Sequence, residues 1–191
     1  MKFDPTLYLV TDSTGRTDDD FLSTLERALT GGVTLVQLRE KERGGGEYLR
    51  LARLTKAVCD RYRVPLIIDD RADIAMAADA AGVHVGQSDL PVCEARKLLG
   101  EDKIVGATAK TVEQAQKAYR EGADYLGTGA IFPTAMPSMG LPFKTFMFPA
   151  FKPPMATTGI GTLRQTSFRR ETGVSTVFTF VVVGKIAPVP R

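Results

Sequence analysis

Five consecutive residues, Gln37-Leu38-Arg39-Glu40-Lys41, combine an amide and two cations directly after a short apolar run. Alternate side chains of an extended chain point to the same side, which groups Gln37, Arg39 and Lys41 and turns Leu38 the other way. Arginine binds phosphate oxygens through a planar fork, and lysine adds a compact positive charge. The segment therefore fits a phosphorylated ligand. The alternative is a strand end held by salt bridges.

Acidic residues follow the next two apolar runs: Asp69-Asp70-Arg71 comes after residues 65–68, and Gly86-Gln87-Ser88-Asp89 comes after residues 83–85. If these runs are neighbouring parallel strands, Asp70 and Asp89 lie on adjacent strand ends beside the cationic segment. Two carboxylates there suit magnesium, which takes oxygen ligands and often bridges to substrate phosphates. The alternative is that Asp70 or Asp89 caps the helix that follows it.

Other reactive residue types are sparse. His84 is the only histidine and lies within the apolar run 83–85, which predicts a packed strand residue and not an acid–base catalyst. Cys59 and Cys93 are far apart and lack the paired spacing of a zinc site, so we expect reduced thiols.

These residues must be positioned by repeated pairs of a short apolar run and a longer amphipathic one. The short apolar runs are typical of strands that are buried on both faces of a parallel sheet. The longer amphipathic runs are typical of the helices that connect such strands. Repeats of roughly 20 residues predict a (β/α) barrel or a doubly wound sheet, in which ligands bind at the carboxyl ends of the strands. The pairs are 7–10 with 18–29, 34–38 with 48–62, 65–68 with 72–80, 83–85 with 92–99 and 103–107 with 112–119, and 125–127 begins a sixth.

The glycine-rich segments do not indicate a nucleotide site. Gly44-Gly45-Gly46 lacks the Lys-Ser/Thr ending of a P-loop, and no G-x-G-x-x-G opens a helix after the first strand. Gly106-Ala107-Thr108 and Gly127-Thr128-Gly129 instead put small residues at the fifth and sixth strand ends, where backbone can approach a ligand closely.

Composition divides the chain near residue 136. The 191 residues are 43% hydrophobic and 25% charged, the profile of a folded globular protein. Residues 1–135 carry a net charge of −3 and residues 136–191 a net charge of +6, with seven of the eleven prolines. We expect residues 136–191 to be poorly ordered or to form an atypical barrel end. No apolar run suits a membrane span or signal peptide, so we expect a cytoplasmic protein without membrane or nucleic-acid partners.

Several phrases of residues 7–135 resemble the thiamine phosphate synthase family, in order and at matching spacing. They are Leu7-Tyr8-Leu9-Val10-Thr11-Asp12, the run 32–41 that ends in Gln37-Leu38-Arg39-Glu40-Lys41, Ile68-Asp69-Asp70-Arg71-Ala72-Asp73, Gly82-Val83-His84-Val85-Gly86-Gln87-Ser88-Asp89-Leu90 and Gly127-Thr128-Gly129-Ala130-Ile131-Phe132-Pro133-Thr134. The resemblance implies a TIM-type (β/α)8 barrel, of which six units are recognisable. It implies an enzyme that joins a pyrimidinylmethyl diphosphate to a thiazole phosphate with magnesium, forming thiamine phosphate and releasing pyrophosphate.

The same resemblance implies the site residues. Arg39 and Lys41 would stabilise the leaving diphosphate, and no protein nucleophile is required. Asp69 stands where the family usually has Asn. The implied pyrimidine-substrate residues are Gln37, Arg39, Lys41, Asp69 and Thr108, Thr134 would begin the segment that holds the thiazole phosphate, and Asp70 and Asp89 would bind Mg²⁺.

The resemblance stops after Ala135. The family continues with Pro-Thr-x-Thr-Lys, whereas here Met136 replaces the second Thr and Pro137 replaces the Lys. Neither can replace the lost hydroxyl or charge. We expect the last two βα units to be missing or replaced, which leaves two sheet edges that the C-terminal segment covers poorly. Residues 174–183 are apolar enough to form one strand.

Three functions remain open at this point. The first is an active thiamine phosphate synthase, which would bind small phosphorylated substrates. The second is an impaired or inactive truncated form that binds only the pyrimidine diphosphate. The third is a relative that resembles thiazole tautomerases, in which a His lies near the fifth strand end where this chain has Thr108-Ala109-Lys110. The oligomeric state does not follow from the sequence.

Overall fold

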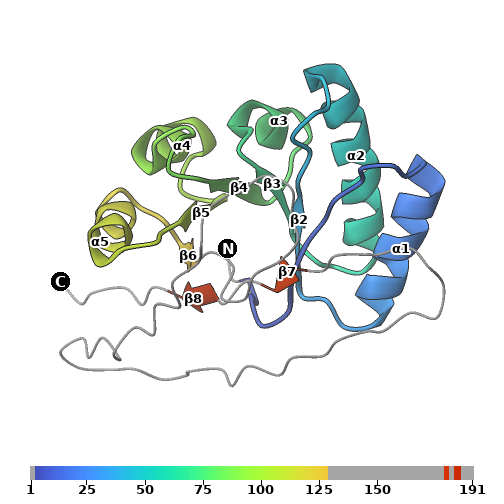
Figure 1. Ribbon diagram of the computed structural model, residues 1–191, viewed down its shortest axis with the longest axis horizontal. Coiled ribbons are helices and arrows are strands. Elements are labelled where there is room, and N and C mark those ends of the chain that lie inside the picture. Colours follow the sequence, from blue (N-terminus) through green and yellow to red (C-terminus); the bar gives the residue numbers. More distant parts are fainter. Residues whose placement is uncertain (1–2, 129–178, 181–182, 186–191) are drawn as a thin grey trace. The chain divides into compact units, whose positions relative to one another are not determined.

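The computed structural model describes residues 3–128, 179–180 and 183–185, all of which belong to one compact unit (Figure 1). Strands and helices alternate along residues 3–128, as predicted. The elements are β1 (Tyr8–Val10), α1 (Asp18–Thr30), β2 (Leu35–Leu38), α2 (Gly45–Arg61), β3 (Leu66–Asp69), α3 (Ala72–Ala77), β4 (Gly82–Val85), α4 (Val92–Leu99), β5 (Ile104–Thr108), α5 (Val112–Arg120), β6 (Tyr125–Gly127), β7 (Thr179–Phe180) and β8 (Val183–Lys185).

The six strands β1 to β6 form one parallel sheet in chain order. The sheet curls into a half-barrel, and helices α1 to α5 cover its outer side (Figure 1). The described residues therefore confirm a parallel α/β fold with six strands, and not the eight complete units that the resemblance implies.

Both edges of the parallel sheet carry a short antiparallel strand. β7 pairs with β1, with Thr179 opposite Val10, and β8 pairs with β6, with Val183 opposite Gly127. Within the predicted strand range 174–183, the described residues form β7 at 179–180, and residue 183 begins the separate strand β8. Each of these two strands occupies an edge that would otherwise present unpaired backbone groups.

Side chains alternate between the two faces of the curled sheet. The larger of two apolar clusters lies between the outer face of the strands and the helices. A second, smaller cluster lies on the inner face and consists of Tyr8, Leu35, Ile67, Ile104 and Tyr125, one residue from each of five strands. Because the period of a strand is two, the inner-face residues two positions further along lie nearer the carboxyl ends. The inner cluster therefore forms the floor beneath the strand ends.

Helix α3 ends earlier than the hydrophobic pattern indicates, at Ala77 and not at residue 80. Asp79 adopts a left-handed backbone conformation with φ of 50°. The amide of Ala80 donates to the Ala75 carbonyl at 2.9 Å and the amide of Asp79 donates to the Met76 carbonyl at 3.0 Å. These two bonds form a Schellman motif, which satisfies the last carbonyls and stops the helix. Apolar residues at 78 and 80 pack into the core, which extended the apparent helical pattern.

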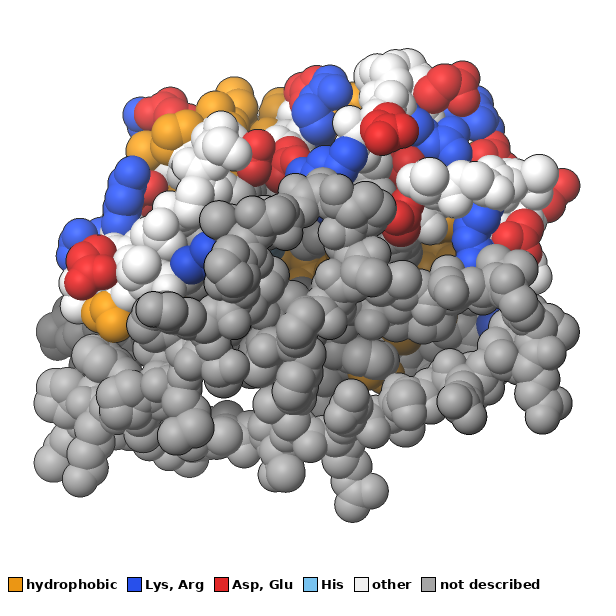
Figure 2. All heavy atoms as spheres, in the orientation of Figure 1, with side chains coloured by type: hydrophobic (Ala, Val, Ile, Leu, Met, Phe, Trp, Pro, Cys, Tyr) orange, Lys and Arg blue, Asp and Glu red, His pale blue; other side chains and the backbone are white. Residues whose placement is uncertain are grey.

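Charged side chains of both signs alternate over the described part of the surface in Figure 2, where no large area has a single sign. Helices with room for a bilayer-spanning apolar stretch are absent from the described ranges.

Gly106 in β5 makes room for the Tyr125 ring, because a Cβ atom there would lie 2.0 Å from Tyr125 Cζ. We expect Gly106→Ala to lower the free energy of unfolding by about 1–3 kcal/mol, the usual cost of overpacking, or to prevent folding. Denaturant unfolding measures this change.

Gly46→Ala is the matched control, since Gly46 lies in α2 with no atom within 4 Å of the added Cβ. That variant should be as stable as the parent or more stable by about 0.5–1 kcal/mol, because alanine favours helix. Equal stability of the two variants would mean that Tyr125 does not occupy the space beside Gly106.

Candidate active site

The predicted site residues that the structure describes gather at the carboxyl ends of β2 to β5. Gln37 lies in β2, Asp69 ends β3 and Thr108 ends β5. The others lie in the loops that directly follow a strand: Arg39 and Lys41 after β2, Asp70 after β3 and Asp89 after β4. Thr134, Met136 and Pro137 lie outside the described residues. The strand-end arrangement agrees with the location of ligand sites in parallel α/β folds.

Two cations meet two carboxylates at the ends of β2 and β3. The Lys41 ammonium contacts both Asp69 and Asp70, and its nitrogen lies 3.1 Å from Asp69 Oδ2. Arg39 Nε lies 3.6 Å from the same Asp69 oxygen. The salt bridges that were the alternative to a phosphate site are therefore present. They also hold both cations at one spot, with the Lys41 side chain still 46% exposed.

Asp69 is the most buried member of this group. Among the described residues its Oδ2 atom has no hydrogen-bond partner and depends on the ion pairs with Lys41 and Arg39. Burial, followed by the neighbouring charge of Asp70, raises the pKa of Asp69 to about 6, although Lys41 and Arg39 act in the opposite direction. For Lys41, burial is outweighed by the hydrogen bond to Asp70 and the Asp69 charge, which raise the pKa.

Asp70 and Asp89 follow the ends of the neighbouring strands β3 and β4, and the two carboxylates interact electrostatically. Burial raises the pKa of Asp89, and the contact with Asp70 raises it further. Neither side chain caps a helix: Arg71 and Pro91 occupy the N-cap positions of α3 and α4, and Asp89 Oδ2 instead accepts from the Gly86 amide at 2.8 Å. The capping alternative is therefore wrong for both residues.

The paired carboxylates fit a hard divalent cation, because two like charges in contact are stabilised when a cation lies between them. Within residues 3–128, 179–180 and 183–185 there is no group of three or more His, Cys, Asp or Glu side chains that could hold a metal ion. A cation bound by Asp70 and Asp89 would thus need further oxygen ligands from substrate or water, which is the usual situation of magnesium.

A chain of buried polar groups crosses the inner face below these residues. Gln37 Nε2 donates to the Tyr8 hydroxyl at 2.7 Å, and the Tyr8 and Tyr125 hydroxyls are 2.7 Å apart. His84 links the other end, with Nδ1 3.1 Å from the Tyr125 hydroxyl and Nε2 2.9 Å from Thr108 Oγ1. The chain therefore joins β2, β1, β6, β4 and β5.

The buried histidine allows a continuous order of donors along this chain. Burial lowers the pKa of His84 to about 4, so the ring is neutral near pH 7 and has one donor and one acceptor. In one consistent order, Gln37 donates to Tyr8, Tyr8 donates to Tyr125, and Tyr125 donates to His84 Nδ1. His84 Nε2 then donates to Thr108, whose own hydroxyl proton is left for a ligand.

Sequence reasoning correctly predicted that His84 is packed in its strand, where it is 8% exposed. It missed the contact with Thr108 and the two tyrosines. Strand parity could have found the contact with Thr108, because His84 and Thr108 both occupy inner-face positions on the neighbouring strands β4 and β5.

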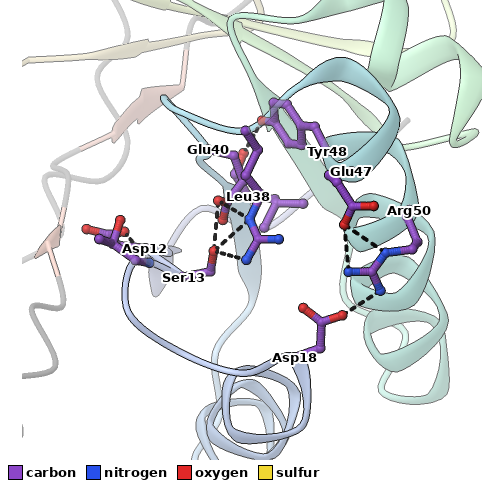
Figure 3. A network of polar contacts seen from close by, with 10 residues as sticks. Asp12, Ser13, Asp18, Leu38, Glu40, Glu47, Tyr48 and Arg50 are labelled. Atoms are coloured by element: carbon purple, nitrogen blue, oxygen red, sulfur yellow. Dashed lines mark hydrogen bonds and ion pairs between the residues drawn. The ribbon is translucent and has the colours of Figure 1, made fainter.

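The loops after β1 and β2 are joined by a separate polar network (Figure 3). Glu40 Oε2 accepts from Ser13 Oγ at 2.8 Å and from Arg43 Nε at 2.9 Å. The Tyr48 hydroxyl lies 2.8 Å from the Leu38 carbonyl oxygen and 3.2 Å from that of Asp69, and so ties the end of β2 to the end of β3. No pattern in the sequence predicted a role for Ser13, Glu40, Arg43 or Tyr48.

Comparisons with known proteins place these residues in a family. The family model described as thiamine monophosphate synthase matches residues 7–178. A thiamine-phosphate synthase of Clostridium tetani is 55% identical over 131 residues, which cover 69% of this chain and 63% of the relative. Thiamine-phosphate synthase 2 of Streptococcus pneumoniae is 56% identical over 128 residues, 67% of this chain and 61% of the relative.

A solved structure, the thiamine phosphate pyrophosphorylase from Pyrococcus furiosus, superposes with a TM-score of 0.62 at 34% identity. The superposition covers 67% of this chain and 61% of that one. The chain therefore spans only about three fifths of the length of these relatives, whereas the family match runs past residue 135, where the resemblance in the sequence stops. With more than half of its residues matched, the chain belongs to the thiamine monophosphate synthase family.

Proposed function

We propose that this chain is a thiamine phosphate synthase whose described residues form the half of the site that binds the pyrimidine diphosphate and magnesium. In the reaction, 4-amino-2-methyl-5-(diphosphooxymethyl)pyrimidine and 4-methyl-5-(2-phosphoethyl)thiazole give thiamine phosphate and pyrophosphate. The observation that carries the proposal is the cluster at the ends of β2 and β3, in which Arg39 pairs with Asp69 and Lys41 contacts both Asp69 and Asp70. The names of the relatives support the same reaction.

The chemistry explains why cations and carboxylates are both needed. The C–O bond to the diphosphate ionises, which leaves a carbocation stabilised by the pyrimidine, and the thiazole nitrogen then attacks that carbon. Arg39 and Lys41 would meet the negative charge that grows on the departing pyrophosphate. A magnesium ion held by Asp70 and Asp89 would add positive charge on the same oxygens. Arg39 and Lys41 exchange the ion pair with Asp69 for the ligand.

The inner-face chain suits the pyrimidine end of the substrate. Thr108 offers a hydroxyl proton whose direction is set by the neutral His84, and Gln37 lies at the other end of the same chain. We place the pyrimidine ring above these groups and the diphosphate above Arg39 and Lys41. The tautomerase-like alternative has no comparable support, because Thr108 stands at the end of β5 where that reading needs a histidine.

The whole fold would be a TIM-type barrel in which the last two of eight units are replaced. Residues 1–135 would form the barrel portion and residues 136–191 the divergent segment. Thr134, together with the positions now held by Met136 and Pro137, belongs to the part that would hold the thiazole phosphate. We therefore expect this chain to hold the second substrate, the thiazole phosphate, poorly.

Arg39→Lys should weaken binding of the pyrimidine diphosphate in the presence of magnesium by about tenfold or more, although the charge is kept, because the planar fork is lost. Isothermal titration calorimetry measures the affinity. Arg50→Lys is the control, since Arg50 pairs with Asp18 and Glu47 on the surface. Equal affinities of Arg39→Lys and the parent would remove Arg39 from the site.

Asp70→Ala should weaken magnesium-dependent binding of the same ligand by at least about tenfold, or about 1.4 kcal/mol, because one of two metal carboxylates is lost. Asp73→Ala removes an aspartate three positions away that pairs with Arg71, and should leave the affinity unchanged. If Asp70→Ala binds as tightly as the parent at every magnesium concentration, Asp70 is not a ligand.

Joining residues 1–135 to the remaining C-terminal part of the Clostridium tetani relative should raise steady-state turnover at least about 100-fold over this chain. Positioning of a second substrate can contribute about 7–11 kcal/mol to a bimolecular reaction, so a missing thiazole-phosphate site is costly. Affinity for the pyrimidine diphosphate should change little. Equal turnover of chimera and parent would show that residues 136–191 hold the second substrate after all.

A further inference from the structure

Glu40 lies between the two ligand-binding cations in the chain, yet its side chain turns away from them. Its side chain is 5% exposed, whereas the Arg39 and Lys41 side chains are 22% and 46% exposed. In Figure 3 the Glu40 carboxylate is joined by dashed lines toward Ser13, in the loop after β1. Alternation along an extended chain puts Glu40 on the side opposite to Arg39 and Lys41.

The contacts of Glu40 form a closed triangle. Ser13 Oγ and Arg43 Nε both donate to Glu40 Oε2, at 2.8 and 2.9 Å. Arg43 also donates to Ser13 Oγ, from the terminal nitrogen Nη2 at 3.0 Å. Ser13 is 2% exposed, and the Arg43 side chain is 25% exposed. The triangle therefore ties the loop after β1 to two points of the loop after β2.

Burying the Glu40 carboxylate in this triangle costs free energy, which is unfavourable if the only role of the triangle is to stabilise the fold. Glu40 Oε1 is buried and has no hydrogen-bond partner among the described residues, and burial raises the pKa of the carboxyl despite Ser13 and Arg43. Residues 39–44 connect β2 to α2 without regular structure, so their backbone needs side-chain contacts to adopt one conformation. Tyr48 fixes the start of this loop through the Leu38 carbonyl, and Glu40 fixes its middle.

We propose that Glu40 is a positioning residue, which holds the loop after β2 through Ser13 and Arg43 so that Arg39 and Lys41 face the diphosphate. The proposal rests on the proposed function, since it concerns the same two cations. The positioning role predicts the direction in which the affinity for an anion changes when the Glu40 charge is removed. Coulomb's law alone says that removing a nearby negative charge strengthens binding of an anion, whereas loss of positioning weakens it.

The test is the affinity of the full chain for inorganic pyrophosphate with magnesium, measured by titration calorimetry on folded protein. Glu40→Gln should weaken binding at least tenfold and Glu40→Ala more, because Gln keeps the length and one acceptor oxygen. Glu47→Gln removes the same charge from a surface carboxylate that pairs with Arg50, and should leave affinity unchanged. Unchanged or tighter binding by folded Glu40→Gln overturns the proposal.

Arg43→Ala should also weaken binding of pyrophosphate. The double variant with Glu40→Gln should bind no more weakly than the weaker single variant, because both substitutions disrupt the same contact between Arg43 and Glu40. Fully additive losses would contradict a shared network. If Glu40→Gln does not fold, Ser13→Ala removes only one donor and should give a smaller loss of the same sign, while unchanged affinity would again overturn the proposal.

Hydrogen exchange separates this proposal from the proposed function. Amides of residues 39–43 should exchange at least tenfold faster in Glu40→Gln than in the parent, with no ligand added. Unchanged exchange there overturns the positioning role, whatever the chain binds. Failure of the parent chain to bind pyrophosphate with magnesium would instead count against the proposed function alone, and the exchange result would still decide the role of Glu40.

Discussion

The contact of one ammonium group with two aspartates determines how the site can be built. Lys41 touches Asp69 and Asp70 at the end of β3, and burial together with Asp70 raises the pKa of Asp89 after the neighbouring strand. Like charges that are partly buried repel each other strongly. Lys41 and Arg39 offset that repulsion, and in the proposed function they would also supply the positive charge that a diphosphate needs. One cluster would then serve both stability and binding.

This arrangement requires rigid strand ends. The floor below the cluster is a chain of hydrogen bonds from Gln37 to Thr108 that crosses five strands, with the His84 ring in contact with the Tyr125 ring. Every member is buried or nearly so, and each link of the chain has a donor and an acceptor when His84 is neutral. A polar chain of this kind holds the strands in one register without introducing a charge. The charges above it can then be left for ligands.

The sequence predicted the parts of the site that depend on strand ends. The carboxyl ends of parallel strands lie on one side of a sheet, and the apolar runs alone show where these strands end. That rule predicted the common location of Gln37, Arg39, Lys41, Asp70 and Asp89. Tyr8 and Tyr125 could not be found in this way, since they are 117 residues apart and meet only because the sheet curls. The contacts among Ser13, Glu40 and Arg43 were not predicted for another reason. They join irregular loops, and loop conformation does not follow the hydrophobic periodicity that identifies helices and strands.

The composition change near residue 136 was visible in the sequence, whereas the direction of the strands that follow was not. β7 and β8 run antiparallel to their neighbours, so the first residue of each, Thr179 and Val183, lies beside the carboxyl end of β1 or β6. Only two residues separate β7 from β8, and a chain of that length spans about 10 Å, so the edges of β1 and β6 must be close to each other. The hydroxyls of Tyr8 and Tyr125 show the same proximity.

A strand that runs in this direction can cover an edge, but it cannot perform the second task of a barrel strand. Loops that follow parallel strands hold the ligands of such folds, whereas β7 and β8 run from the carboxyl ends of β1 and β6 toward their amino ends. Covering the edges of the sheet and holding the second substrate of the proposed reaction are thus separate requirements. The C-terminal strands meet the first of them, but their direction does not meet the second.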